Sequence, residues 1–451
     1  MGRYFGTDGI RGVANVDLTP QLAFLAGFAA ATVIGADANS AARLHVIVGK
    51  DTRISSDMLE AALTAGLCSG GADVTPIGVV PTPTVAYLTR KTDAEIGVVI
   101  SASHNPFEHN GIKFFNRNGL KLTDEQESAI EDIITAQLNG AEASLKFGGE
   151  LGRIIADSSG FEAYIDHIAS RATNDFAGLR VALDCANGAA SMTARRLFSR
   201  FKCTVELIHD CPNGTNINTD CGSTHIDSLR KTVTSGGFDV GFAFDGDADR
   251  CLIIDENGDL IDGDVLLALA AQAMKHNGKL NSNAIVGTIG SNAGLDEFSR
   301  TEEITLYRAD VGDRHVVAMM LERGLNLGGE TSGHTIFLDD STTGDGQLSA
   351  VKFLNLLAET GKTASELSRT VPRFPQVIAN AVTANIDKAR KMADPRLAEA
   401  VADAERELFG AGRIFVRPSG TEALIRVTVE AETEEKATAI AERVAKTVRA
   451  I

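Results

Sequence analysis

The sequence predicts an α/β protein with three related α/β domains and a smaller C-terminal α+β domain. At 451 residues the chain is too long for one hydrophobic core, so several domains are expected. Short apolar segments typical of buried strands alternate with segments typical of helices over most of the chain, which is the pattern of α/β domains. The pattern breaks at Pro372-Arg-Phe-Pro375, and the elements expected after this linker indicate a domain of a different kind.

The first domain is predicted at residues 1–155. Thr19-Pro20 is typical of a helix start, because Thr caps the first turn and Pro fits the first helical position. Thr123 with Gln126 has the pattern of a capping box. A polar turn, Lys50-Asp-Thr-Arg53, follows the first apolar strand. The expected strands are residues 44–48, 74–77 and 96–100, and the expected helices are residues 56–68 and 123–140.

The second and third domains, predicted at residues 156–254 and 255–370, repeat this alternation. Their expected strands are 181–183, 205–208, 240–244, 284–289 and 304–306. Their expected helices are 188–200, 225–235, 264–275, 292–300, 314–323 and 345–359, and Thr363 with Glu366 caps a last one. The fourth domain, 371–451, is expected to contain strands 413–417 and 424–430 and a helix from Glu434.

The composition argues against several kinds of protein. With 43 basic and 60 acidic residues the net charge is −17, which argues against nucleic acid as a partner. No stretch reaches the roughly 18 apolar residues of a membrane span, and the first residues lack the apolar core of a signal peptide. The six cysteines are scattered, without the density of a disulfide scaffold. A cytoplasmic protein that does not bind membranes is expected.

A group of histidines and cysteines in the second domain contains the atoms of a zinc site: His209, Cys211, Cys221 and His225. Their spacing fits no paired-ligand zinc pattern. Buried thiols and surface histidines are therefore the preferred interpretation.

Three aspartates alternate directly after the predicted strand 240–244, at Asp245, Asp247 and Asp249. Clustered carboxylates repel one another unless a cation lies among them, and hard oxygen ligands suit Mg²⁺ or Ca²⁺. An EF-hand loop is disfavoured, because Arg250 stands where that loop needs Gly and the flanking elements are strands. Mg²⁺ is favoured over the alternative of an acidic surface turn.

Two serines, Ser101 and Ser103, follow the apolar strand 96–100. The end of a buried strand is a common place for chemistry in an α/β sheet. A serine hydrolase would need a Gly-x-Ser-x-Gly elbow, which is absent here. A serine that carries a phosphoryl group fits better, with Mg²⁺ and Lys113 neutralising its charge during transfer. The alternative is that the serines only cap the turn before Pro106.

Two further loops have the composition of ligand-binding segments. In Gly328-Gly-Glu-Thr-Ser-Gly-His334, Glu330 and Ser332 suit sugar hydroxyls and His334 suits proton transfer near neutral pH. The second loop combines guanidinium groups, hydroxyls and a flexible glycine, as a phosphate cradle does. Its residues are Arg417, Ser419, Gly420, Thr421 and, farther on, Arg426. A plain turn remains the alternative for each loop.

Together these segments resemble the α-D-phosphohexomutase superfamily, and within it the bacterial glucosamine branch. The resemblance runs from Phe5 to the terminal domain. It rests on four motifs in this order: Ser101-Ala-Ser-His-Asn-Pro106, Asp245-Gly-Asp-Ala-Asp-Arg250, Gly329-Glu-Thr-Ser-Gly-His334 and Arg417-Pro-Ser-Gly-Thr421. The glucosamine branch is indicated by Phe5-Gly-Thr-Asp-Gly-Ile-Arg-Gly12, Ala248 and Thr342-Thr-Gly-Asp-Gly346. Two residues depart from its usual pattern: Thr331, where Gln is usual, and Ala423, where Pro is usual.

The resemblance implies four domains around a central cleft, with mixed sheets in the three α/β domains. It implies that Ser103 carries phosphate and binds Mg²⁺ with the three aspartates. Glu330 and Ser332 match a sugar-recognition loop. The matches to a phosphate-binding loop are Arg417, Ser419, Gly420, Thr421 and Arg426. The catalytic candidates near the reacting phosphate are Arg11, His104 and Lys113, with Lys113 and His334 as candidate proton carriers.

The implied reaction interconverts glucosamine 6-phosphate and glucosamine 1-phosphate through glucosamine 1,6-bisphosphate. It would supply UDP-N-acetylglucosamine and cell-wall synthesis. The expected ligands are Mg²⁺ and a small sugar phosphate, and the expected state is a monomer or homodimer. The alternatives are a phosphoglucomutase or phosphomannomutase acting on neutral hexose phosphates, a Mg²⁺-dependent phosphatase, and a non-catalytic sugar-phosphate sensor.

Overall fold

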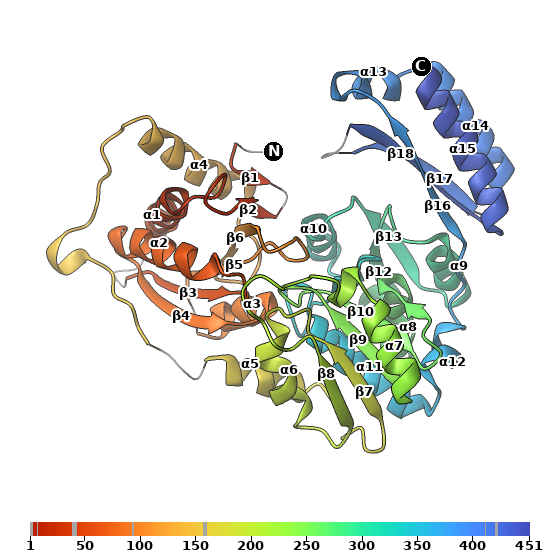
Figure 1. Ribbon diagram of the computed structural model, residues 1–451, viewed down its shortest axis with the longest axis horizontal. Helices are drawn as coiled ribbons and strands as arrows, with labels where there is room; N and C mark the ends of the chain where they lie inside the picture. The colour runs from red at the N-terminus through yellow and green to blue at the C-terminus, as the bar shows by residue number, and fades with distance from the viewer. Residues whose placement is uncertain are drawn as a thin grey trace. The chain divides into compact units, whose positions relative to one another are not determined.

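The computed structural model divides into two compact units, one of residues 1–290 and 306–369 and one of residues 291–305 and 370–451. Each is described by itself, and Figure 1 shows the chain coloured by residue number. The residues described are 3–6, 8–37, 43–92, 94–156, 160–410, 412–419 and 423–451.

The first unit begins with a six-stranded mixed sheet. Its strands are β1 (Phe5–Gly6), β2 (Gly9–Val13), β3 (His45–Lys50), β4 (Asp73–Val79), β5 (Ile96–Ile100) and β6 (His109–Asn116). The order is β1-β2-β6-β5-β3-β4, with β4, β3 and β5 parallel and the others antiparallel to their neighbours. The helices are α1 (Pro20–Asp37), α2 (Ser56–Ser69), α3 (Thr82–Lys91) and α4 (Asp124–Leu138).

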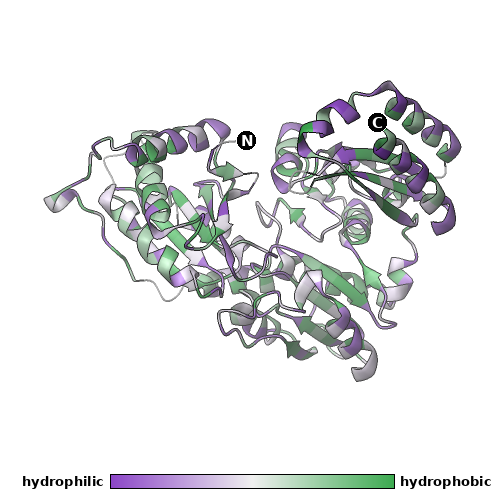
Figure 2. Ribbon diagram, turned by 45° about the horizontal axis from the view of Figure 1, so that its top comes forward, coloured by the Kyte–Doolittle hydropathy of each residue, from purple (hydrophilic) through white to green (hydrophobic). Residues whose placement is uncertain are grey.

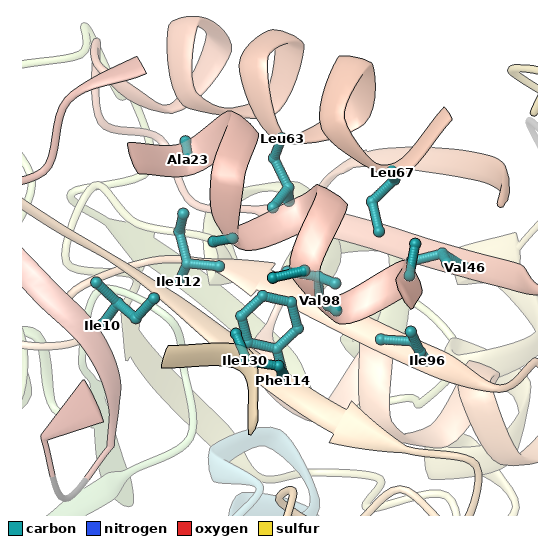
Figure 3. Packing of buried hydrophobic residues seen from close by; sticks show 14 of the residues in the cluster. Ile10, Ala23, Val46, Leu63, Leu67, Ile96, Val98, Ile112, Phe114 and Ile130 are labelled. Atoms are coloured by element: carbon teal, nitrogen blue, oxygen red, sulfur yellow. The ribbon is translucent and has the colours of Figure 1, made fainter. Parts of the chain in front are cut away.

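Both faces of this sheet are buried, which explains its continuous apolar strands. Along β5, Ile96 and Val98 join the core formed with α1, α2 and α4, whereas Val99 joins a second core formed with α3. Successive side chains of a strand point to opposite faces, so a strand covered on both sides is apolar throughout. Figure 3 shows Leu63 and Leu67 of α2 packed over the strand residues of the larger core.

The first unit contains two more mixed sheets. The second has the order β11-β10-β9-β7-β8 and the third has the order β13-β12-β14-β15. Their strands are β7 (Arg180–Asp184), β8 (Thr204–Ile208), β9 (Val240–Phe244), β10 (Cys251–Asp255), β11 (Leu260–Ile261), β12 (Ala284–Thr288), β13 (Thr305–Ala309), β14 (Leu327–Gly329) and β15 (Thr335–Phe337). The helices are α5 (Gly160–Ala169), α6 (Ala190–Phe198), α7 (Asp227–Gly236), α8 (Gly263–His276), α10 (Asp313–Arg323), α11 (Gly346–Thr360) and α12 (Ala364–Ser368).

The second unit contains a three-stranded antiparallel sheet with β18 at its centre. Its elements are α9 (Ala293–Thr301), β16 (Gln376–Val382), α13 (Lys388–Met392), α14 (Pro395–Leu408), β17 (Gly412–Pro418), β18 (Leu424–Ala431) and α15 (Glu434–Ala450). One core joins the sheet to α14 and α15. Figure 2 shows hydrophilic and hydrophobic residues together on these two helices, as expected for helices with one buried side.

The expected strands and helices all have counterparts, and β9 has the predicted bounds. The capping boxes at Thr123 and Thr363 are both formed. Several elements were not predicted, among them α3, α5, β6, β10, β16 and α14. The domain boundaries after residues 155, 254 and 370 stay a prediction. None of the helices in the described part of the chain has both the length and the apolar composition needed to cross a membrane.

Helices α1 and α2 approach each other closely at two glycines. A Cβ atom on Gly27 would lie 2.4 Å from the carbonyl oxygen of Leu63, and one on Gly66 would lie 2.0 Å from that of Phe24. No real Cβ contact is that short, so these glycines set the distance between the helices.

Replacing Gly66 by Ala is therefore expected to destabilise the protein by about 1–3 kcal/mol, because the helices must separate. In an open helix the same change stabilises by up to about 1 kcal/mol. Gly149→Ala is the control, since a Cβ there has no neighbour within 4 Å. Thermal melting of the two variants checks this, and a Gly66→Ala protein as stable as the control contradicts it.

Candidate active site

Two polar loops meet at the carboxyl ends of neighbouring parallel strands. Ser101 and Ser103 follow β5, and Asp51 and Arg53 follow β3. Parallel strands that end at the same edge bring their loops together, which is where α/β sheets usually carry binding sites. Ser103 has a left-handed backbone, with φ of 53°. Only a few per cent of non-glycine residues adopt this conformation.

The hydroxyl of Ser103 faces the second sheet. It donates to Asp245 Oδ2 at 2.6 Å and lies 3.3 Å from His104 Nδ1. Ser101 instead supports the loop: its Oγ accepts from the Ser103 N–H at 3.0 Å and donates to Asp51 Oδ2 at 2.6 Å. Of the two serines, Ser103 is therefore the one presented for chemistry.

The aspartate loop lies between β9 and β10, and its three carboxylates are buried. Asp245, Asp247 and Asp249 each place an oxygen within 4.8 Å of the others. A Cβ on Gly246 would lie 2.5 Å from the carbonyl oxygen of Ser103, so glycine is needed where the two loops touch. The sequence prediction of a carboxylate cluster next to Ser103 agrees with this geometry.

The aspartate loop fits a hard divalent cation such as Mg²⁺. Asp247 Oδ1 and Asp249 Oδ1 are buried and accept no hydrogen bond. Burial and the charges of Asp249 and Asp247 raise the pKa of Asp245 well above its ordinary value. Both observations indicate a site that lacks positive charge, and carboxylate oxygens are the ligands that Mg²⁺ prefers.

Lys113 supplies part of that charge. Its Nζ is 2.8 Å from Asp247 Oδ2, 3.1 Å from Asp8 Oδ2 and 3.7 Å from Asp249 Oδ2. Burial opposes the charged form, but the attraction of these three carboxylates raises the pKa of Lys113 above its ordinary value. Lys113 therefore remains an ammonium group beside the aspartate loop.

The two candidate histidines differ in charge preference. Burial, with help from Arg250 and Arg11, lowers the pKa of His104 to about 4, so this ring is neutral near pH 7. Burial also opposes charge on His334, but Asp249 and other carboxylates outweigh it and raise its pKa to about 9. The Gly344 N–H, which donates to His334 Nε2 at 3.0 Å, favours the opposite form, a neutral ring with its proton on Nδ1, toward Asp249.

A cavity of about 1060 Å³ brings the predicted loops of the first unit together. Its walls include Arg11, Ser103 and His104 from the first sheet's loops, Asp249 and Arg250 from the aspartate loop, and Glu330, Ser332 and His334 from the loop between β14 and β15. The Ser332 hydroxyl is buried without a hydrogen-bond partner. Glu330 Oε1 accepts the Gly312 N–H at 2.9 Å. The cavity thus brings the predicted sugar-recognition residues Glu330 and Ser332 onto the same surface as Ser103.

Thr331 lies between Glu330 and Ser332 but has a different role. Its hydroxyl donates to Asp264 Oδ2 of α8 at 2.7 Å. A side chain committed to α8 is not available to a ligand in the cavity. The departure from the usual Gln at this position therefore leaves the cavity-lining residues unchanged.

The structure adds charged residues that the sequence analysis did not single out. Asp8 contacts Lys113, and Lys121 Nζ lies 2.6 Å from both Asp8 Oδ1 and Asp313 Oδ2. Although burial opposes it, the attraction of Lys113, Lys121 and Arg11 holds the pKa of Asp8 well below its usual range. In the sequence, only its position in the glycine-rich segment that contains Arg11 could have indicated Asp8 as a site residue.

The predicted phosphate loop lies in the second unit. Arg417 of β17 and Arg426 of β18 are directly opposite each other in the antiparallel pair, so their side chains share one face. Like charges directly opposite each other are destabilising. Ser419 is buried and its N–H donates to the Leu424 carbonyl. Gly420 and Thr421 lie outside the described residues.

Half of the disfavoured zinc group does come together. His209 and Cys221 lie with Asp184 in a cluster whose ligand atoms are within 4.8 Å of one another. Both oxygens of Asp184 already accept a backbone N–H, from Ala186 and Gly222. His209 Nδ1 is 3.1 Å from Asp184 Oδ1, so a His–Asp contact beside a buried thiol explains the cluster.

Four family models match successive parts of the chain. They describe phosphoglucomutase/phosphomannomutase α/β/α domain I at residues 2–140, domain II at 162–258, domain III at 262–374 and the C-terminal domain at 379–447. The chain belongs to the phosphoglucomutase/phosphomannomutase family. This confirms the predicted superfamily and the architecture of three α/β domains followed by a different C-terminal domain.

Curated relatives within this family resemble the chain along nearly its full length. The phosphoglucosamine mutase of Acetivibrio thermocellus is 50% identical over 430 residues, which is 95% of each chain. That of Clostridium novyi is 48% identical over 448 residues, or 99% of each chain.

Solved structures of the family show the same fold at low sequence identity. A Burkholderia thailandensis phosphoglucomutase/phosphomannomutase family protein has a TM-score of 0.81 at 23% identity, with 98% of this chain and 97% of that chain covered. Aspergillus fumigatus N-acetylphosphoglucosamine mutase in complex with GlcNAc-6P and magnesium has a TM-score of 0.68 at 18% identity, with 95% and 97% covered. A further structure of the fungal enzyme holds glucose 1,6-bisphosphate, with a TM-score of 0.66 at 19% identity and 100% and 96% covered.

Asp247→Asn is expected to weaken Mg²⁺ binding at least about tenfold, because an amide replaces a charged oxygen ligand. Calorimetric titration of Mg²⁺ into the protein measures this. Asp255→Asn is the matched control, since Asp255 is also buried in this domain and accepts backbone N–H groups outside the loop. Equal Mg²⁺ affinity in the two variants contradicts the assignment.

Proposed function

We propose that this protein is a phosphoglucosamine mutase, which interconverts glucosamine 6-phosphate and glucosamine 1-phosphate through a phosphoserine at Ser103. The observation that carries the proposal is the Ser103 hydroxyl 2.6 Å from Asp245, on the wall of a cavity that also contains Glu330 and Ser332. The curated relatives named phosphoglucosamine mutase support the choice of sugar.

The reaction consists of two phosphoryl transfers. In the first, the bond between Ser103 Oγ and phosphorus breaks while the free sugar hydroxyl forms a bond to phosphorus and loses its proton. The product is glucosamine 1,6-bisphosphate. After the bisphosphate turns round in the cavity, its other phosphate returns to Ser103. Such transfers depend mainly on positioning and on neutralising the charge of the phosphoryl oxygens.

The charged groups around Ser103 suit this task. When bound by Asp245, Asp247 and Asp249 together with Ser103, Mg²⁺ supplies positive charge to the phosphoryl group. Lys113, held as an ammonium group by the same carboxylates, adds to that charge. Arg11 and Arg250 lie on the cavity wall and present guanidinium groups to an incoming phosphate.

Glu330 and Ser332 are proposed to hold the sugar in either orientation. One oxygen of Glu330 is fixed by the Gly312 N–H, and the Ser332 hydroxyl has no partner of its own. Hydrogen bonds from a sugar would satisfy both groups.

The proton of the sugar hydroxyl needs an acceptor. The described cavity wall contains three imidazoles: a neutral His104, whose Nδ1 is 3.3 Å from Ser103 Oγ, His315 and His334. Lys113 is an ammonium group, which can donate a proton but cannot accept one. We therefore propose an imidazole as the base and Lys113 as a group that stabilises charge.

The phosphate that is not reacting is proposed to bind between Arg417 and Arg426, with Ser419, Gly420 and Thr421. We also propose that the protein works in the cytoplasm, as a monomer or homodimer, and supplies UDP-N-acetylglucosamine and cell-wall synthesis. The net charge of −17 and the scattered cysteines support this setting.

The function is tested by assaying purified protein with Mg²⁺ on glucosamine, glucose and mannose phosphates. We expect the highest kcat/KM with glucosamine 6-phosphate, and at least about a thousand-fold loss of kcat in Ser103→Ala, which has lost the phosphate carrier. Intact mass measurement should find one phosphate on the wild type and none on the variant.

Other outcomes of that assay point to the alternatives. Activity confined to glucose or mannose phosphates sinks the glucosamine assignment. Net release of inorganic phosphate without isomer exchange indicates a phosphatase. Sugar-phosphate binding without turnover indicates a sensor, and unchanged turnover in Ser103→Ala rules out the phosphoserine route.

The phosphate loop is tested with Arg417→Gln. Losing one charge-assisted bond to phosphate is expected to raise KM for glucosamine 6-phosphate about tenfold or more, while kcat changes less. Arg406→Gln is the control, because Arg406 is exposed on α14 and pairs only with Asp403 three residues away. Steady-state kinetics separates the two, and an unchanged KM in Arg417→Gln contradicts the assignment.

A further inference from the structure

The loop that carries Ser103 is held by groups from outside itself. Ser103 has a left-handed φ of 53°, a conformation that is strained for an L-residue and persists only when its surroundings impose it. The backbone carbonyls of the loop, from Ser103 to His109, turn inward and need donors. What supplies those donors also decides where the Ser103 hydroxyl points.

Arg53 supplies most of them. Its side chain is fully buried, and every N–H of its guanidinium is used. Nη2 donates to the carbonyls of Ser103 at 2.9 Å and Asn105 at 2.8 Å, and Nη1 donates to those of His109 at 3.0 Å and Pro106. Nε donates to Asp51 Oδ2 at 2.8 Å, which balances the buried charge.

Asp51 connects the same network to the serines. One of its oxygens accepts from Arg53 Nε and from Ser101 Oγ, and Ser101 Oγ in turn accepts the Ser103 N–H. From the loop that follows β8, Asn218 Nδ2 donates to the Ser103 and Asn105 carbonyls at 2.9 and 3.0 Å. Both the N–H and the carbonyl of Ser103 are therefore fixed, and the Ser103 carbonyl accepts from two different loops.

We infer that Arg53 is a positioning residue for phosphoryl transfer, which fixes the carbonyls of the Ser103 loop so that Oγ is aimed at the aspartate loop and the cavity. The inference rests on the proposed function, because it concerns transfer to and from Ser103. Arg53 does not line the cavity and acts through the loop alone.

The guanidinium geometry is what the loop requires. Arg offers five N–H donors in a rigid planar fork, and all five are matched here, whereas Lys offers three donors around one atom. Lys at position 53 keeps the ion pair with Asp51 but cannot reach four separated carbonyls. A displacement of the reacting atom by about 1 Å is enough to slow an enzyme about a hundred-fold.

The test compares wild type with Arg53→Lys in single-turnover phosphoryl transfer. Each protein, free of phosphate, is mixed with glucose 1,6-bisphosphate and Mg²⁺, and the gain of phosphate on Ser103 is followed by intact mass. We expect the transfer rate and kcat to fall about a hundred-fold. KM for glucosamine 6-phosphate and the Mg²⁺ affinity should stay within threefold, which a general loss of structure would not produce.

Arg230→Lys is the control, since Arg230 of α7 also donates through Nε to a backbone carbonyl, that of Gly258 in the turn between β10 and β11. It should transfer phosphate at the wild-type rate. Transfer by Arg53→Lys within threefold of wild type overturns the inference and leaves the proposed function standing. A wild-type protein that gains no phosphate from the bisphosphate overturns both.

A second variant keeps the test decisive if Arg53→Lys does not fold. Asn218→Ala removes two donors from the same carbonyls and leaves Arg53 in place. We expect the transfer rate to fall several-fold with KM unchanged. An unaltered transfer rate in a folded Asn218→Ala protein also counts against control of Ser103 through its loop carbonyls.

Discussion

The hydrogen bond from Ser103 to Asp245 is the contact on which the site depends. It joins residues 142 positions apart, from loops at the ends of two different sheets. The bond forms only because Gly246 lets the aspartate loop reach the Ser103 backbone, and because the left-handed turn at Ser103 directs the hydroxyl out of its own sheet. Without this contact the three carboxylates and Ser103 would lie in separate parts of the chain and could not act together.

The site also resolves a conflict between the whole protein and its ligand. A net charge of −17 repels phosphate, and three buried aspartates add to that repulsion locally. Cationic side chains close to the site offset this repulsion. Lys113 lies among the carboxylates, and Arg11 and Arg250 lie on the cavity wall. Short-range charges in a buried site outweigh a distant surface field that salt screens.

The parts of the fold with a local cause were predictable from sequence. The strand Val240–Phe244 and the two capping boxes depend on neighbouring residues. The aspartate cluster was recognisable because its three carboxylates are close together in the sequence and would repel one another without a cation. Arg53 and Asp8 were not predictable as site residues, because their partners are remote: Ser103 is 50 residues from Arg53, and Lys121 is 113 residues from Asp8. Such pairs follow from strand order, which leaves no periodic trace in a sequence. For the same reason, composition indicated the two arginines of the phosphate loop, but only the strand register placed them face to face.

The loop between β14 and β15 alternates residues that line the cavity with residues that anchor the loop. Glu330, Ser332 and His334 face the cavity, whereas Thr331 bonds α8 and Gly333 packs where a Cβ would meet the Cys251 carbonyl at 2.3 Å. Neighbouring residues of one short segment thus have unrelated structural roles. A different side chain at 331 would change how the loop is anchored to α8, whereas Glu330, Ser332 and His334 form the surface that a ligand in the cavity would meet.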